Sequence, residues 1–352
     1  MGNERMNDRV TLYDVKKSVI KIKGREFHLS IDENEVGRGG TCLVYHAHES
    51  VFDAEGKMLK RKVLLKEFYP ELPRDGEEQI CRMKNGRLQI PEQVKDSTEY
   101  KVKLQRFLDS YVIFTKLYNN PETNNYVVKS REMVEGNNTW YLIMDYDEAK
   151  SLESYIEKEP PLYRFMCTLK KIAEAIMHVH QQGYLHMDIT PGNILRFSGG
   201  GVRLMDVDSF INKEDILQGE PRKVILSYSR GYTDPEVVAY FENNLFSKNT
   251  FWKMGEKVDI FSIGAILYRY LFGKQLDFET ECLLGGSLLD MDKVTGHLKQ
   301  FEYERNFRDA VCSRYKDCPE KGISLLRAFM RKLLARDWKD RADSMVFRAM
   351  LR

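Results

Sequence analysis

The residues best suited to chemistry lie in one short stretch of the chain, residues 184–208. This stretch carries the carboxylates of Asp188 and Asp206 and the carboxamide of Asn193. A carboxylate can accept the proton of a hydroxyl group, and carboxylate and amide oxygens are hard ligands that suit Mg²⁺. The sequence therefore predicts a site at which Asp188 reaches a substrate hydroxyl group while the other two side chains hold a divalent cation.

A tight hairpin is expected to bring Asn193 and Asp206 together. Residues 193–197 and 202–206 are apolar and strand-like, and the Ser-Gly-Gly-Gly sequence at 198–201 is typical of a turn. With the turn centred on 198–201, Asn193 and Asp206 stand opposite each other, and their Cα atoms are expected about 5 Å apart.

Length and composition limit the class of protein. The chain has 352 residues, more than one typical core, so we expect two packed lobes. It has 55 Lys and Arg against 53 Asp and Glu, a formal net charge of +2, which gives no reason to expect a nucleic-acid partner. With 42% hydrophobic and 31% charged residues, the chain has enough apolar residues for a core and is too apolar to be disordered.

Three absences in the sequence indicate the compartment. The polar start lacks the apolar run of a secretory signal. The longest apolar run, residues 260–272, is too short to span a bilayer and contains Arg269. The six cysteines form no Cys-x-x-Cys pair, so neither a disulfide framework nor a zinc site is indicated. We therefore expect a cytoplasmic protein with no membrane partner.

Strands dominate the first part of the chain, residues 25–146. One long helix interrupts them, with an apolar stripe from Val102 to Leu117. An insert at about 70–95 precedes this helix, and its Asn85-Gly86 pair predicts a hairpin because both positions tolerate positive φ. These elements predict a small antiparallel-sheet lobe.

Helices dominate residues 147–352. The segment 260–272 is apolar nearly all round, which predicts a helix buried in the middle of this part. Residues 1–24 are polar and form either a frayed arm or an added strand. The expected fold is α+β, with an N-terminal arm, a sheet lobe at 25–146 and a larger helical lobe at 147–352.

The order His186-x-Asp188-x-x-x-x-Asn193, followed by a strand, a turn and Leu204-Met205-Asp206, resembles the catalytic and metal-binding loops of protein-kinase-like phosphotransferases. In style it is similar to bacterial Hanks-type serine/threonine protein kinases, and the resemblance extends over about residues 27–352. Further matches occur in the family's order: Gly37-x-Gly39-x-x-Cys42-x-Val44, Val63-Leu64-Leu65-Lys66, Tyr232-Thr233-Asp234-Pro235-Glu236, Asp259-Ile-Phe-Ser262-Ile-Gly264 and Asp337-Trp-Lys-Asp-Arg341. The resemblance implies the bilobal kinase fold.

The resemblance also implies a role for each matching residue. Asp188 would orient the attacking hydroxyl group and accept its proton, and Asn193 and Asp206 would hold Mg²⁺. ATP would be bound through its phosphates by the backbone of Gly37, Gly39 and Gly40 and by Lys66, and through its adenine by Val44, Met144, Asp145, Tyr146 and Asp147. His186 would be structural and bond backbone near Asp206, and Glu236 would form a buried ion pair with Arg341.

Several positions depart from the family pattern. Cys42 replaces the third glycine of the phosphate loop and narrows the room for a close backbone approach. Met187 replaces the usual arginine, and Thr190 replaces a lysine that contacts the γ-phosphate. Asp208 replaces the glycine of Asp-Phe-Gly, and it either adds a metal oxygen or is a solvated turn residue.

The largest departure concerns the long helix. The family places a glutamate there to pair with Lys66, but no glutamate lies between Tyr100 and Pro121. Asp109 or Ser110 stands near the expected position. Either Asp109 takes the partner role with a shorter reach, or Lys66 is held some other way.

These observations favour an ATP- and Mg-dependent protein kinase that phosphorylates Ser or Thr of protein substrates. Two alternatives stay open. A pseudokinase or regulatory nucleotide-binding scaffold is favoured by the missing helix glutamate, Cys42 and Thr190. A small-molecule phosphotransferase of the same fold is also consistent with Pro191-Gly192-Asn193, although such enzymes generally lack a peptide-binding segment that ends in Pro235-Glu236.

Overall fold

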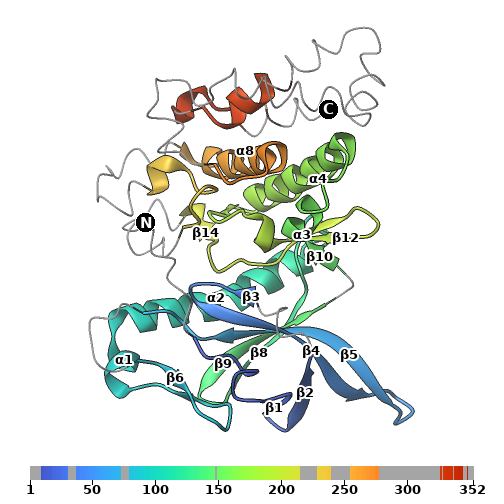
Figure 1. The fold of residues 1–352 in the computed structure, drawn as a ribbon, viewed down its shortest axis with the longest axis vertical. Coiled ribbons are helices and arrows are strands. Elements are labelled where there is room, and N and C mark those ends of the chain that lie inside the picture. The colour runs from blue at the N-terminus through green and yellow to red at the C-terminus, as the bar shows by residue number, and fades with distance from the viewer. Residues whose placement is uncertain are drawn as a thin grey trace. The chain divides into compact units, whose positions relative to one another are not determined.

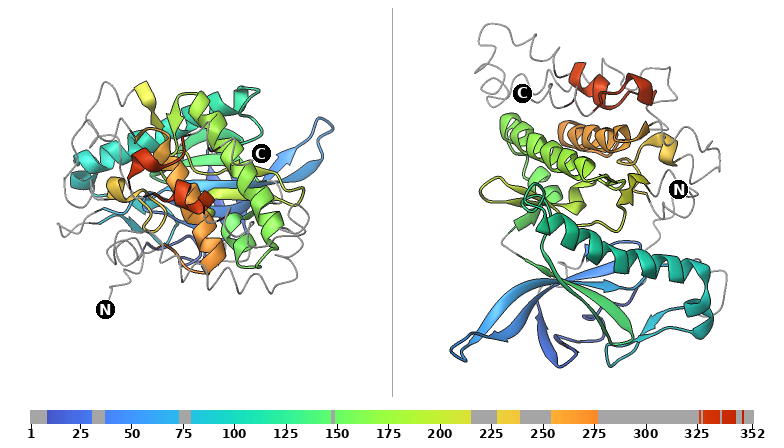
Figure 2. Two further views of the ribbon diagram at one scale, coloured as in Figure 1. Left: turned by 90° about the horizontal axis from the view of Figure 1, so that it is seen from above. Right: turned by 180° about the vertical axis from the view of Figure 1, so that it is seen from behind.

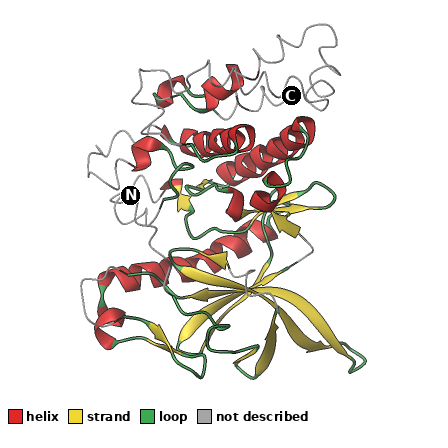
Figure 3. Cartoon of the chain, viewed as in Figure 1, coloured by secondary structure: helices red, strands yellow, loops and turns green. Residues whose placement is uncertain are grey.

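The structure is a computed structural model that describes residues 9–30, 37–72, 79–146, 149–214, 228–238, 254–276, 326, 328–335, 337–343 and 347. The chain divides into two compact units (Figure 1). The sheet unit comprises Met1–Asn124 and Val128–Glu148, and the helical unit comprises Asn125–Val127 and Ala149–Arg352. Strands gather in the first unit and helices predominate in the second (Figure 3), so the predicted α+β class is confirmed.

The sheet unit is built on a seven-stranded sheet in which β1, β2, β4, β5, β9 and β8 lie in that order and β3 pairs with β4. All pairs are antiparallel. The strands are β1 (Val19–Ile22), β2 (Arg25–Leu29), β3 (Gly37–Arg38), β4 (Cys42–Phe52), β5 (Met58–Phe68), β8 (Ser130–Gly136) and β9 (Thr139–Asp145). Of residues 1–24, therefore, residues 19–22 add a strand to the sheet.

The insert before the long helix forms the predicted hairpin. Its strands β6 (Cys81–Arg82) and β7 (Leu88–Gln89) pair antiparallel, and Gly86 has a φ of 88° in the connecting turn. The short helix α1 (Glu92–Asp96) and the long helix α2 (Thr98–Asn119) follow. The side chain of Ser97 caps α2 by accepting a hydrogen bond from the N–H of Tyr100.

Both faces of the central strand β5 are covered. Because side chains alternate along a strand, Lys66 and Phe68 lie on one face and Glu67 lies on the other. Phe68 packs on the rings of Tyr100 and Phe107 of α2, which runs along the sheet (Figure 2). The opposite face belongs to one buried apolar cluster that joins strand residues to the N-terminal segment and the hairpin, including Leu12, Tyr45, Leu65, Leu88 and Tyr141.

The helical unit centres on two helices, α4 (Leu162–Gln181) and α8 (Lys257–Phe272), which contact each other. Nearly every residue of α8 is buried, as its all-round apolar sequence predicts. The ring of Phe165 on α4 stacks on Tyr270 of α8, with centroids 3.8 Å apart. Among the described residues no helix combines the length and apolar character needed to cross a membrane.

Short elements of the helical unit carry the loop residues of interest. They are β10 (Ala149–Ser151), α3 (Leu152–Ile156), β11 (Tyr184–Leu185), the 3₁₀ turn η2 (Pro191–Asn193), β12 (Ile194–Phe197), β13 (Val202–Leu204), β14 (Ile211–Asn212) and η4 (Trp338–Asp340). Strands β10, β12 and β13 form one small sheet, and β11 and β14 form another.

Candidate active site

The loop between β11 and β12 brings Asp188 and Asn193 together. The Asn193 Nδ2 atom donates hydrogen bonds to the backbone oxygen of Asp188 at 3.0 Å and to its carboxylate Oδ2 at 3.3 Å. Both residues are partly buried. Because Nδ2 is engaged with Asp188, the Oδ1 atom of Asn193, which lies in the same amide plane, points away from these two hydrogen bonds. This orientation makes Oδ1 a suitable oxygen ligand beside the Asp188 carboxylate.

The buried carboxylate of Asp259, near the start of α8, holds the beginning of this loop. It accepts hydrogen bonds from the backbone N–H of His186 at 2.7 Å, from the N–H of Met187 at 2.9 Å, and from the His180 ring at 2.7 Å. Met187 has a φ of 68°, in the left-handed region that a non-glycine residue adopts only at an energetic cost. The sequence matched Asp259 to the family but did not predict that it anchors the residues just before Asp188.

Burial and hydrogen bonding shift the pKa values of Asp259 and of the neighbouring His186. Burial by itself raises the pKa of the Asp259 carboxyl group, but the hydrogen bonds from His180 and from the His186 backbone outweigh it and hold that pKa below its usual value. Burial lowers the pKa of the His186 imidazole, so its ring is neutral near neutral pH. Asp259 is therefore an anionic acceptor for two backbone donors.

The surroundings of His186 differ from the expectation that its ring bonds backbone near Asp206. Its Nδ1 atom lies 3.4 Å from the N–H of Asp188, its ring packs on Phe210, and its backbone oxygen accepts a hydrogen bond from the Ser209 hydroxyl. The Nε2 atom is buried and has no hydrogen-bond partner among the described residues. His186 is structural, but it acts mainly through packing and its backbone.

The hairpin that follows exists, but its predicted register is wrong by one residue. Ile194 pairs with Leu204, and the N–H of Met205 donates to the oxygen of Asn193 at 2.9 Å. Asn193 therefore stands opposite Met205 and not Asp206. The reason is a three-residue loop, closed by a hydrogen bond from the Phe197 N–H to the Gly201 oxygen, with Gly200 at a φ of 79°.

Asp206 follows directly on this hairpin, and its Oδ1 accepts the N–H of Asp208 at 2.9 Å. This contact turns the chain back, so Asp208 takes part in a turn of the kind that Asx side chains stabilise. A carboxylate and an amide oxygen from Asp206 and Asn193 fit Mg²⁺, which usually takes one or two protein ligands together with phosphate oxygens. The described residues contain no cluster of three or more His, Cys, Asp or Glu side chains that could hold a metal by itself.

In the glycine-rich turn between β3 and β4, three successive carbonyl groups accept hydrogen bonds from the N-terminal segment and from the residues that follow β5. The Gly40 oxygen accepts the N–H of Glu71 at 2.8 Å, the Thr41 oxygen accepts the N–H of Tyr69 at 3.0 Å, and the Gly39 oxygen accepts the Arg9 guanidinium. In a trans peptide the N–H points opposite to the carbonyl of the same unit. The N–H groups of Gly40 and Thr41 are therefore turned away from these partners, as in loops that bind anions.

This turn leaves room for a phosphate to approach. Gly39 and Gly40 are exposed, and a Cβ built on Gly40 would meet no heavy atom of the described residues within 4 Å. Gly37 is different, since its Cβ would lie 3.2 Å from the Cβ of Val44, its partner across the strands. Cys42 is buried in the first position of β4 and lies outside the open part of the turn.

Three of the remaining nucleotide candidates of the sheet unit share one face of the sheet. Val44 stands opposite Lys66, and Met144 stands opposite Leu64 on the next strand pair. Directly opposed residues project to the same side of a sheet, and residues two apart on one strand do so too. Val44, Lys66 and Met144 therefore lie on the face that α2 covers, and Lys66 is 3% exposed.

The helix α2 provides no carboxylate to Lys66, which decides between the two alternatives for its partner. Asp109 is exposed and accepts a hydrogen bond from Gln105 on its own helix at 2.8 Å. Ser110 is buried, but its hydroxyl donates to the Phe107 oxygen of the preceding turn. Of the two alternatives, the one in which Asp109 pairs with Lys66 is wrong, because Asp109 lies on the solvent side of the helix.

The segment predicted to bind adenine begins in the last two residues of β9. The N–H of Asp145 donates to the Lys129 oxygen at 2.9 Å, and its carboxylate pairs with Arg131. The Tyr146 ring meets His46 edge-on, with centroids 4.6 Å apart. Asp147 lies outside the described residues.

The ion pair expected between Glu236 and Arg341 is also wrong, since the partner of Arg341 is Asp234. The Arg341 guanidinium contacts Asp234 Oδ2, and both side chains are fully buried. Glu236 is only partly buried, and burial raises the pKa of its carboxyl group. The Asp234 Oδ1 atom accepts the N–H of Glu236 at 2.8 Å, so Asp234 also caps the short turn that carries Glu236 outward.

Sequence reasoning also missed three residues on the other face of the sheet, namely Arg9, Glu67 and Arg82. One signal was available in the sequence. Lys66 and Glu67 are adjacent charged residues in the otherwise apolar run 63–68, so one of them must face the side opposite the nucleotide candidates. Glu67 is fully buried there and pairs with Arg82.

Comparison with known proteins gives the same indication as the loop geometry. A family model described as the protein kinase domain matches residues 89–348. Serine/threonine-protein kinase MRCK beta of Homo sapiens is 27% identical over 202 residues, which cover 53% of this chain and 11% of that protein. Aurora kinase A-B of Xenopus laevis is 29% identical over 143 residues, 40% of this chain and 31% of that protein.

A third relative, serine/threonine-protein kinase cds1 of Schizosaccharomyces pombe, is 29% identical over 147 residues, 40% of this chain and 30% of that protein. The chain thus spans less than a third of each of these relatives. The family model, by contrast, covers well over half of the chain and includes Asp188, Asn193, Asp206 and Asp259. The chain belongs to the protein kinase family.

Proposed function

We propose that the protein is an ATP- and Mg²⁺-dependent kinase that transfers the γ-phosphoryl group of ATP to Ser or Thr hydroxyl groups of protein substrates. One observation carries the proposal, the double hydrogen bond from Asn193 Nδ2 to the backbone and the carboxylate of Asp188. This contact supports the proposal because it links a carboxylate, which can accept the proton of a hydroxyl group, to a carboxamide, whose oxygen can bind a cation. Two relatives named as serine/threonine-protein kinases support the choice of hydroxyl group.

Each residue then has a defined task. Asp188 orients the attacking hydroxyl group and accepts its proton as the phosphoryl group is transferred. Asn193 and Asp206 hold the cation, which when bound neutralises charge on the phosphate oxygens. The backbone of Gly37, Gly39 and Gly40 and the Lys66 ammonium group hold the ATP phosphates, and Val44, Met144 and the backbone of residues 145–147 hold the adenine. Asp259 positions Asp188 without touching the substrate.

The test is ATP turnover on generic protein substrates, followed by identification of the phosphorylated amino acids. Asp188→Ala should abolish turnover, whereas Asp96→Ala, which removes an exposed carboxylate of the sheet unit, should leave it unchanged. EDTA should abolish the activity and added Mg²⁺ should restore it. Turnover that survives Asp188→Ala, or phosphate found on a small molecule instead of protein, would count against the proposal.

A second candidate, a nucleotide-binding scaffold without catalysis, is favoured by one observation. The whole of α2 is described, and its only glutamate is Glu99 in the first turn. A kinase fold without this partner for Lys66 can retain nucleotide binding and lose transfer. Mg-dependent ATP binding without phosphate transfer to any protein, in a preparation that is fully folded, would identify this alternative.

A further inference from the structure

A layer of two segments, which we call the cap, covers the face of the sheet opposite Lys66. It consists of residues 9–17 and residues 79–90. Leu12 and Leu88, one from each segment, are almost fully buried in the same cluster as Leu65 of β5. The segments also touch each other, since a Cβ on Gly86 would lie 3.4 Å from Leu12. The cap is therefore a packed part of the sheet unit.

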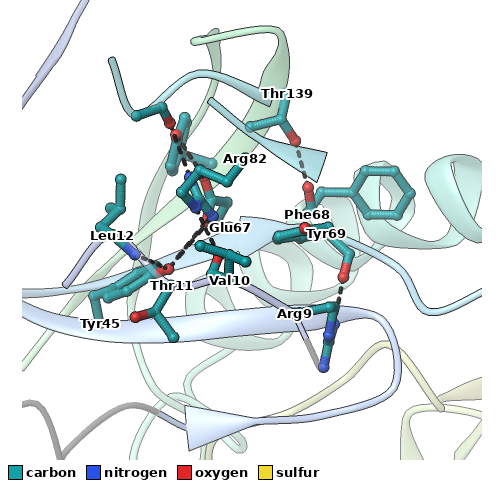
Figure 4. Close-up of polar contacts among 12 residues, drawn as sticks. Arg9, Val10, Thr11, Leu12, Tyr45, Glu67, Phe68, Tyr69, Arg82 and Thr139 are labelled. Atoms are coloured by element: carbon teal, nitrogen blue, oxygen red, sulfur yellow. Dashed lines mark hydrogen bonds and ion pairs between the residues drawn. The ribbon is translucent and has the colours of Figure 1, made fainter. Parts of the chain in front are cut away.

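Arg82 links the cap to β5 through a buried ion pair. Its guanidinium pairs with the Glu67 carboxylate, and both side chains are fully buried (Figure 4). The same guanidinium donates to the Val10 oxygen at 2.8 Å and to the Gly86 oxygen at 2.9 Å, which joins both segments of the cap. Tyr141 donates its hydroxyl to Glu67 at 2.8 Å. The buried charges thus have the partners that a pair in such a place needs.

Arg9 fastens the cap to the glycine-rich turn. Its guanidinium donates to the oxygen of Tyr69, just after β5, and to the oxygen of Gly39 (Figure 4 shows the Tyr69 contact). The Glu71 carboxylate lies 3.6 Å from the same group, and Arg38 donates back to the Arg9 oxygen at 3.1 Å. The Arg9 side chain is 7% exposed. Arg9 therefore links the turn to the end of β5.

The position of the Gly39 oxygen matters because it sets the direction of the next amide. Gly39 and Gly40 share one planar peptide unit, so a fixed Gly39 carbonyl fixes the Gly40 N–H on the opposite side. The peptide units on either side have their own hydrogen bonds, from the Gly39 N–H to the Cys42 oxygen at 3.1 Å and from the Glu71 N–H to the Gly40 oxygen at 2.8 Å. The unit between them joins two glycines, which have the widest choice of backbone angles. Without Arg9 the Gly39 carbonyl loses the guanidinium contact that holds it, and the direction of the Gly40 N–H is less firmly fixed.

The Glu67 contact has the same consequence for Lys66. Neighbouring Cα atoms are about 3.8 Å apart across a trans peptide, so a residue clamped at position 67 restrains the backbone at position 66. The helix α2, on the Lys66 side, offers no carboxylate for that purpose. In addition to the pairing of β5 with β4 and β9, the Glu67–Arg82 contact restrains this part of β5 from the opposite face.

We propose that the cap is a positioning element for ATP, in which Arg9 fixes the phosphate-binding turn and Arg82 fixes the strand of Lys66 through Glu67. Neither arginine touches the nucleotide. This proposal rests on the proposed function, because it assigns ATP phosphates to the turn and to Lys66.

The first test compares Arg9→Ala and Arg9→Lys with Arg87→Ala. Arg87 lies in the same cap, but its side chain is exposed and donates a hydrogen bond to the side chain of Asn138. It therefore serves as a matched control. We expect Arg9→Ala to raise the KM for ATP about tenfold, with kcat changed by less than about twofold. Arg9→Lys should restore part of the loss, because an ammonium group can reach one of the two carbonyls.

A second readout does not depend on catalysis. In the absence of nucleotide, amide hydrogen exchange in residues 37–44 should be faster in Arg9→Ala than in wild type and Arg87→Ala. Unchanged exchange together with an unchanged KM for ATP would overturn the positioning role. Faster exchange in Arg9→Ala, found together with a wild-type protein that binds no ATP, would support the contact of Arg9 with the turn and instead overturn the proposed kinase function.

The Arg82 contact needs a variant that folds, because an unpaired buried charge destabilises a protein strongly. The triple variant Glu67→Leu, Arg82→Met and Tyr141→Phe removes both buried charges and the hydroxyl group of Tyr141 together. If it folds with a wild-type circular dichroism spectrum, we expect its KM for ATP to rise about tenfold, with kcat again little changed. A folded triple variant with the wild-type KM for ATP would overturn the Arg82 part of the proposal.

Discussion

The carboxylate of Asp259 accepts a hydrogen bond of 2.9 Å from the backbone N–H of Met187, the residue directly before Asp188. Met187 is held at a φ of 68°, and the second oxygen of Asp259 takes the adjacent N–H of His186. A single buried side chain of α8 thus maintains a strained turn on which the proposed base depends.

We expect Asp259→Asn to lower kcat more than ATP affinity. The substitution replaces one acceptor oxygen with an NH₂ group that faces backbone donors, so the turn relaxes and Asp188 moves. A shift of this kind can lower kcat by up to about a hundredfold. The measurement is steady-state kinetics alongside a direct Kd for ATP.

Ser262→Ala is the control for this prediction. Ser262 is buried on the same helix, and its hydroxyl bonds the Val258 oxygen of that helix at 3.4 Å, away from the loop. It should retain a wild-type kcat. A wild-type kcat in folded Asp259→Asn would show that the turn before Asp188 does not depend on this carboxylate.

The Asp234–Arg341 pair predicts which acidic residue braces the helical unit. Asp234→Ala leaves Arg341 charged and buried without its carboxylate, so the free energy of unfolding should fall by about 3–5 kcal/mol. Glu236→Ala should lower it by less than about 1 kcal/mol, since Glu236 is partly exposed and does not contact Arg341. Urea denaturation of both variants gives the comparison. Equal losses, or a larger loss for Glu236→Ala, would contradict the pairing.

The sequence predicts the hairpin that follows Asn193 but not its register. The strands and the turn at 198–201 were predictable from composition, and the hairpin is present. However, three consecutive glycines allow positive φ at several positions, so the length of the loop is not set by the residue types. In the structure Gly200 is the loop residue with positive φ, and the loop has three residues. As a result, Met205 is the residue opposite Asn193. A shift of one residue in a turn changes every partner along a strand.

The cap could not be predicted for a different reason. The sequence marks β5 and α8 by runs of apolar residues. The cap, by contrast, is held in part by arginines that bind backbone oxygens. Val10, Gly39 and Gly86 contribute only their carbonyl groups to Arg9 and Arg82, and Tyr69 contributes its carbonyl group together with its ring, which both guanidinium groups face. Every residue type has a carbonyl group, so no pattern in the sequence marks such partners.

His186 predicts a specific pH dependence of stability. Burial lowers the pKa of its ring from the ordinary value of 6.5, so the unfolded chain takes up a proton at a higher pH than the folded protein does. The stability that the neutral ring contributes is therefore present above that pH and is lost as pH falls through the lower folded-state pKa. Asp259, Asp206 and His180 are the charged or titratable groups that act on the ring.

We expect the free energy of unfolding of wild type to fall more between about pH 7 and about pH 5 than that of His186→Leu. Urea denaturation at several pH values measures the difference. His28→Leu, at an exposed histidine of β2, should follow the wild-type curve. If His186→Leu and wild type lose the same stability over this range, protonation of the buried ring is not the cause.

Gly264 predicts how closely α8 is packed against the C-terminal part of the helical unit. A Cβ at this position would lie 2.7 Å from the Cβ of Leu333 and 2.9 Å from the Cδ2 of Leu334. The Leu334 side chain can rotate, but the Leu333 Cβ is attached directly to its backbone, so the two segments must separate. We expect Gly264→Ala to lower the free energy of unfolding by about 1–3 kcal/mol. Gly199→Ala is the control, because a Cβ there meets nothing within 4 Å, and it should change stability by less than about 0.5 kcal/mol. Equal stability of the two variants would mean that residues 333 and 334 do not rest against Gly264 in solution.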